Sequence, residues 1–134
     1  MEIINYVINI LIGLFSGVYA GLIVARVAKF EELKNEAKRV VWGIDYVSIN
    51  DSNPNVTSTT DRTIFSAISS ELYYLRHSNA GDKINQLSNI IDHTMRRPPN
   101  YVDDMNKNYL TWQKIIRELR PDFKSIFTIS RLAL

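Results

Sequence analysis

IINYVINILIGLFSGVYAGLIVA, residues 3–25, is a run of 23 residues without a charged side chain. As an α-helix rising about 1.5 Å per residue, it would be roughly 34 Å long, slightly more than the roughly 30 Å hydrocarbon core of a bilayer. A buried helix of a water-soluble domain rarely stays uncharged over such a length. The run therefore predicts a transmembrane helix, and residues 1–28 are assigned to a membrane anchor.

Two other interpretations of this run fit it less well. A cleaved signal peptide is suggested by Val18-Tyr19-Ala20 and Ile23-Val24-Ala25, which resemble a small-x-small cleavage site. However, the residues before the run include Glu2 and no Lys or Arg, and the run is long for the apolar core of a signal peptide. A buried helix of a soluble domain is the remaining alternative.

The basic residues predict the orientation of the span. All 16 Lys and Arg residues follow it, and Arg26, Lys29, Lys34, Lys38 and Arg39 lie closest. Because basic residues near a span favour the cytosolic side, we expect the N-terminus outside and the rest of the chain in the cytosol of a single-pass cell-membrane protein. Arg26 and Lys29 are expected to contact lipid headgroups.

Three glycines stand four residues apart within the run. Each would cost about 1 kcal/mol relative to alanine in a soluble helix, whereas between membrane helices small residues allow close packing. Asn side chains on the same face could form hydrogen bonds across such a contact. The spacing predicts self-association or pairing with a partner transmembrane helix; the alternative is that glycine is merely common in membrane helices. The predicted interface consists of Asn5, Asn9, Gly13, Ser16, Gly17, Ala20, Gly21 and Ala25.

Beyond the span, apolar residues recur with helical spacing. The row Phe30, Leu33, Ala37, Val40, Ile44 and Val47 predicts a juxtamembrane helix over residues 29–49, and a polar loop is expected over residues 50–60. Residues 61–134 are predicted to form a helical domain, with a turn at 78–81 and a third helix capped by Asp82. The predicted core of this domain consists of Phe65, Ile68, Leu72, Leu75, Val102, Met105, Tyr109, Trp112, Ile116 and Leu119.

These patterns predict an all-α fold. One N-terminal transmembrane helix precedes a small cytosolic antiparallel bundle of about four helices, because short helical rows joined by short loops are typical of bundles. Pro121 is expected to end the last long helix, and FKSIFTISRLAL, residues 123–134, to form a short further one. The sequence contains no convincing strand pattern.

The sequence offers no recognisable catalytic, cofactor or metal site. It has no Cys, and its two histidines, His77 and His93, lack metal-binding spacing and are expected at the surface or at helix ends. Asp51, Asn53 and Asn55 match the first ligand positions of a calcium-binding EF-hand loop. Val56 and Arg62, however, stand where Gly and a bidentate Glu are required.

Function is therefore predicted from organisation alone. The net charge of +2 is too small to indicate a nucleic-acid partner. We expect a non-enzymatic membrane protein whose helical domain binds or regulates a cytosolic protein partner. Membrane lipid and a second copy of the chain are the other expected partners. The alternative is a membrane-disrupting or pore-lining effector with the glycine and asparagine face turned toward a channel.

Overall fold

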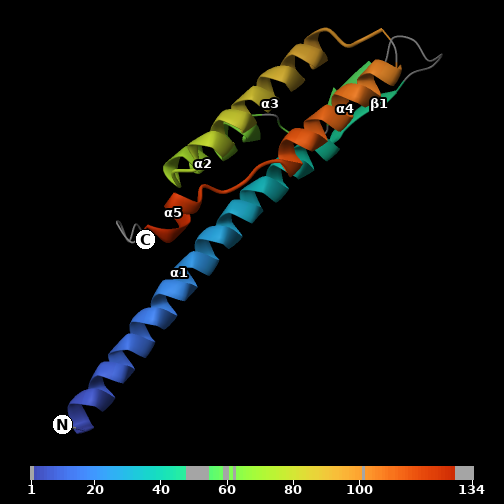
Figure 1. Ribbon diagram of the computed structural model, residues 1–134. Coiled ribbons are helices and arrows are strands. Elements are labelled where there is room, and N and C mark those ends of the chain that lie inside the picture. The colour runs from blue at the N-terminus through green and yellow to red at the C-terminus, as the bar shows by residue number, and fades with distance from the viewer. Residues whose placement is uncertain (1, 48–54, 59–60, 62, 101, 129–134) are drawn as a thin grey trace.

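The structure, a computed structural model, describes residues 2–47, 55–58, 61, 63–100 and 102–128. It is mostly helical, and one long apolar helix stands at its N-terminus, as expected (Figure 1). The elements in chain order are α1 (Glu2–Trp42), β1 (Ile44–Val47), β2 (Asn55–Ser58), α2 (Ile64–Tyr74), α3 (Ser78–Arg96), α4 (Val102–Arg117) and α5 (Phe123–Phe127).

Helix α1 is one continuous element of 41 residues with two different environments. Its N-terminal half projects away from the other elements, and its C-terminal half lies along them (Figure 1). The helix has no break near residue 28, so the segments predicted as a membrane anchor and a juxtamembrane helix form one continuous helix as far as Trp42. The core-facing residues of the second half are Phe30, Leu33, Ala37, Val40 and Val41.

A short β-hairpin follows α1, where a helix had been predicted. Gly43 ends α1, and its N–H donates to the carbonyls of Arg39 and Val40. Strands β1 and β2 then pair antiparallel, with Ile44 opposite Ser58 and Val47 opposite Asn55. The expectation of helix through residue 49 therefore holds only as far as Trp42, and residues 55–58 are strand rather than loop. The β-branched and aromatic residues of IDYV favour a strand once glycine has ended the helix.

Helices α2 and α4 pack against the C-terminal half of α1, and α3 packs against α2 and α4. Of the predicted core residues, Phe65, Ile68, Leu72, Met105, Trp112, Ile116 and Leu119 are buried, and Leu75, Val102 and Tyr109 are partly buried. Helix α3 adds Ile84, Leu87 and Ile91 to this core.

The turn between α2 and α3 is shorter than predicted. Helix α3 begins at Ser78 rather than at Asp82, because Arg76 reverses the chain with a φ of 63°. The His77 N–H then donates to the carbonyl of Leu72 at 2.8 Å, which closes the end of α2. Glycine is the usual residue in this left-handed conformation, so an arginine there gave no turn signal. Gly81 consequently lies inside α3, buried under the ring of Tyr73.

Candidate functional site

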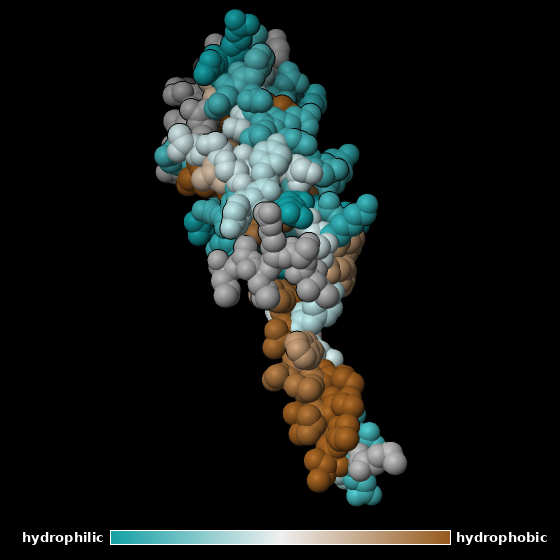
Figure 2. All heavy atoms as spheres, turned by 90° about the vertical axis from the view of Figure 1, so that its left-hand side faces the viewer, coloured by the Kyte–Doolittle hydropathy of each residue, from teal (hydrophilic) through white to brown (hydrophobic). Residues whose placement is uncertain are grey.

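The main candidate site is the exposed apolar half of α1. It contains the one helical segment, among the described residues, that is long and apolar enough to cross a membrane, and none of the apolar 18-residue window is buried. Figure 2 shows this hydrophobic segment projecting from a largely hydrophilic surface. The core helix of a soluble protein would bury such side chains. Here Ile3, Ile10 and Phe15 are 79%, 70% and 71% exposed.

The glycine face of this segment is open. A Cβ atom placed on Gly13, Gly17 or Gly21 would meet no atom within 4 Å. Ser16 already donates its hydroxyl to the carbonyl of Ile12 at 2.7 Å, so it does not need a bond to a neighbouring helix. At about 100° per residue, Gly17 lies about 160° around the axis from Tyr19, which contacts the folded part of the chain. The folded part therefore leaves the glycine face accessible.

At the end of the apolar segment, side chains of α1 hold the C-terminal end of α5. Arg26 Nη1 donates to the carbonyls of Ser125, Ile126 and Thr128 at 3.2, 2.9 and 2.7 Å. The hydroxyl of Tyr19 donates to the carbonyl of Phe127 at 2.9 Å. A cation at a helix C-terminus is favourable because the last carbonyls lack helical partners. Sequence reasoning missed this contact, since about 100 residues separate its partners.

The next basic residues of α1 are also engaged within the chain. Lys29 pairs with Glu71 of α2 at 3.1 Å and with Glu32 at 3.2 Å. The hydrogen bond to Glu71, assisted by Glu32, raises the pKa of Lys29. Lys34 Nζ donates to the carbonyl of Leu119 at 3.1 Å, just beyond the end of α4. The expected contact of Arg26 and Lys29 with lipid headgroups stays a prediction. In the structure, both side chains already bond to groups of the same chain.

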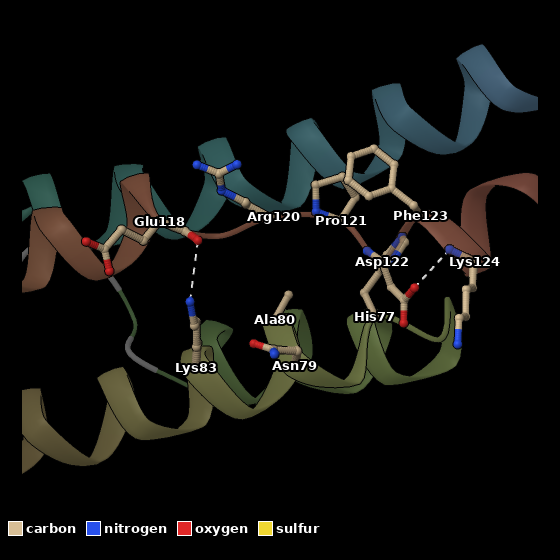
Figure 3. Close-up of a pocket in the computed structure, with 10 residues that line it drawn as sticks. All are labelled: His77, Asn79, Ala80, Lys83, Glu118, Arg120, Pro121, Asp122, Phe123 and Lys124. Carbon is tan, nitrogen blue, oxygen red and sulfur yellow. Dashed lines mark hydrogen bonds between the residues drawn. The ribbon is translucent and has the colours of Figure 1, made fainter.

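A groove of about 740 Å³ lies between the start of α3 and the segment that joins α4 to α5 (Figure 3). Lys83, Arg120 and Lys124 line it together with the carboxylates of Glu118 and Asp122. Lys83 Nζ donates to the carbonyl of Glu118 at 3.5 Å. The mixture of charges gives the groove no single-sign field that would select a charged ligand.

His77 also lines this groove and has a structural role. It precedes α3, as a helix-end histidine was expected to, but it is buried rather than exposed. Its Nδ1 accepts a hydrogen bond from the N–H of Asp122 at 3.1 Å, and its ring packs edge-on against Phe30. Burial lowers the pKa of His77, while the Asp122 carboxylate acts in the opposite direction. The neutral ring therefore joins α1, α3 and the segment before α5.

The remaining metal-binding candidates are the other histidine and the calcium-like pattern. His93 is exposed in the last turn of α3. Asp51, Asn53 and Arg62 lie outside the described residues, and Asn55 begins β2. Within the described ranges, no group of three or more His, Asp or Glu residues is arranged to hold a metal ion.

Comparisons with protein families, with curated proteins and with solved structures find no match for this chain.

Proposed function

We propose that this chain is a single-pass membrane protein in which α1 anchors a helical interaction domain. The observation that carries the proposal is the contrast within one helix. Residues 3–18 expose their apolar side chains, whereas Phe30, Leu33 and Ala37 of the same helix are buried. A bilayer would cover the exposed apolar half without any rearrangement of the folded part.

The basic residues after the span support a cytosolic location for the folded part, with the N-terminus outside. The role we propose for the folded part is binding or regulation of a protein partner rather than catalysis. Its groove has mixed charge, and its most deeply buried polar residue near the groove, His77, serves packing.

Self-association through the glycine face completes the proposal. Close packing of small residues drives helix association in lipid, and the face formed by Gly13, Gly17 and Gly21 is open and points away from the folded part. Two copies could therefore cross at Gly17 with their folded parts on opposite sides of the contact.

The experiment that tests membrane insertion and orientation is a pair of reporter fusions after Leu134, combined with alkaline extraction of membranes. The chain should stay in the membrane fraction, a cytosolic reporter should be active and a periplasmic reporter silent. Extraction into the soluble fraction would refute the anchor, and the opposite reporter pattern would refute the orientation. Release of dye from liposomes by the purified protein, dependent on Asn5 and Asn9, would favour a pore-lining effector instead.

A further inference from the structure

Helix α5 lies beside α1 at the end of the apolar segment, closer to the N-terminus of α1 than the other helices (Figure 1). Its position there is set by the bonds from Tyr19 and Arg26 described above. On its other side, Ser125 donates its hydroxyl to the carbonyl of Arg76 in the α2–α3 turn at 2.7 Å. Helix α5 is therefore held from two directions.

The length of the apolar segment determines how deep α5 would lie in a bilayer. A span needs about 20 residues to cross the hydrocarbon core. Counted from Ile3, the first residue after Glu2, the core would then end near Leu22. Tyr19 lies about three residues, or roughly 4.5 Å, inside that boundary. Because the Tyr19 hydroxyl contacts Phe127, the end of α5 lies at the level where hydrocarbon gives way to headgroups.

The backbone carbonyl groups of α5 are hydrogen-bonded in the way that a position near hydrocarbon requires. Unsatisfied carbonyls are costly near hydrocarbon, where water cannot bond to them. The carbonyls of Ser125, Ile126 and Thr128 accept from Arg26, and that of Phe127 accepts from Tyr19. The carbonyl of Lys124 accepts from the Thr128 hydroxyl at 2.5 Å. Each carbonyl from Lys124 to Thr128 thus has a partner within the protein.

The side chains of α5 also suit a position at the surface of a bilayer. Phe123 and Phe127 are 67% and 53% exposed, although both are large and apolar. At a spacing of four residues they share one side of the helix, while Ile126 is buried against the folded part. Helices that lie in the membrane interface typically insert Phe and other apolar side chains at the boundary between headgroups and acyl chains. Lys124, next to Phe123 in the sequence, carries a charge suited to lipid phosphates.

We infer that α5 is an interfacial element: it lies in the headgroup layer of the same bilayer that α1 spans, with Phe123 and Phe127 inserted among the lipids. This inference rests on the proposed membrane anchor. It adds a second membrane contact, about 100 residues away in sequence, which fixes how the folded part sits on the membrane surface. The occupant is lipid because the hydroxyl of Tyr19, within the apolar segment of α1, bonds the carbonyl of Phe127, so the exposed aromatic pair lies beside the part of α1 that we place in the bilayer.

The test uses single-cysteine variants of the full chain, which contains no cysteine of its own. Phe127→Cys and Phe123→Cys report on α5, Val18→Cys reports on the span, and Leu110→Cys is a matched control. Leu110 is an apolar residue of α4 that is 58% exposed, and Val18 is equally exposed at 58%. Each variant is labelled with a nitroxide, checked for helical content, and reconstituted into phosphatidylcholine–phosphatidylglycerol vesicles.

Accessibility of each label to dissolved oxygen and to a water-soluble nickel chelate then measures depth. Position 18, about four residues inside the hydrocarbon boundary, should favour oxygen over the chelate. Position 110 should favour the chelate, and positions 123 and 127 should fall between them on the lipid side. Labels on α5 that match position 110, while position 18 reports lipid, would overturn the interfacial role and leave the anchor standing. A label at position 18 that matches position 110 would overturn the anchor and the interfacial role together. Shielding of positions 123 and 127 from both reagents would overturn lipid as the occupant in favour of a protein contact.

Discussion

Replacing Arg26 with alanine should release the C-terminal end of α5 while the rest of the fold persists. Nη1 of Arg26 carries two hydrogens shared among the carbonyls of Ser125, Ile126 and Thr128, so we count two charge-assisted hydrogen bonds. Each contributes about 1.5–3 kcal/mol, and the lower value applies because the side chain is only partly buried. The free energy of opening α5 should therefore fall by about 3 kcal/mol. That corresponds to roughly 100-fold faster amide exchange, since about 1.4 kcal/mol is tenfold.

Hydrogen–deuterium exchange of the peptide that covers residues 122–128 measures this opening. Its reporters are the N–H groups of Ile126 and Thr128, which donate to the carbonyls of Asp122 and Lys124. Arg26→Lys, which keeps the charge without the guanidinium, should give an intermediate rate. Lys107→Ala is the control because it removes a cation from an exposed pair with Asp104 on α4 and should leave α5 unchanged. Exchange in Arg26→Ala as slow as in the wild type would refute the role of the carbonyl contacts.

Three further predictions concern the core, a buried histidine and the apolar segment. Trp112→Ala should lower the free energy of unfolding by about 3–5 kcal/mol in urea denaturation. Trp112→Phe should lower the free energy of unfolding much less, because it removes an indole N–H that is buried without a partner among the described residues. Equal losses of stability in the two variants would contradict this. Burial lowers the pKa of His77, so the unfolded state binds the proton more tightly and stability should fall as pH drops below the unfolded value of about 6.5. His77→Gln should flatten this dependence, and an unchanged slope would assign it to other groups. Gly17→Ile should abolish self-association in a transmembrane dimerisation assay, whereas Leu14→Ile, about 60° away around the helix, should not. Equal signals from both variants and the wild type would exclude the glycine face as a self-association surface.

The features that local sequence predicts well are those that depend on neighbouring residues alone. A run of 23 uncharged residues can form a long apolar helix wherever it lies, because helical hydrogen bonds join residues four apart. The rows through Phe65 and Leu72 and through Met105 and Trp112 likewise place buried side chains on one face without knowledge of the partner helix. The same reasoning was ambiguous at Ile44 and Val47, whose spacing of three residues suits a helix row but whose side chains also favour a strand. Gly43 and the pairing with β2 decided in favour of the strand.

Tertiary structure alone decided which partners the basic residues after the apolar segment contact. By sequence, Arg26 was one of several cations close to a predicted membrane boundary. In the folded chain it meets the carbonyl end of a helix about 100 residues away, and Lys34 meets the end of α4 in the same manner. The physical reason is that a helix end leaves carbonyls unsatisfied, and which cation reaches them depends on how the helices pack. The burial of His77 was also decided by tertiary structure. Its position at a helix end follows from the local turn, whereas its burial follows from Phe30 and Asp122, which the fold brings together from α1 and the segment before α5.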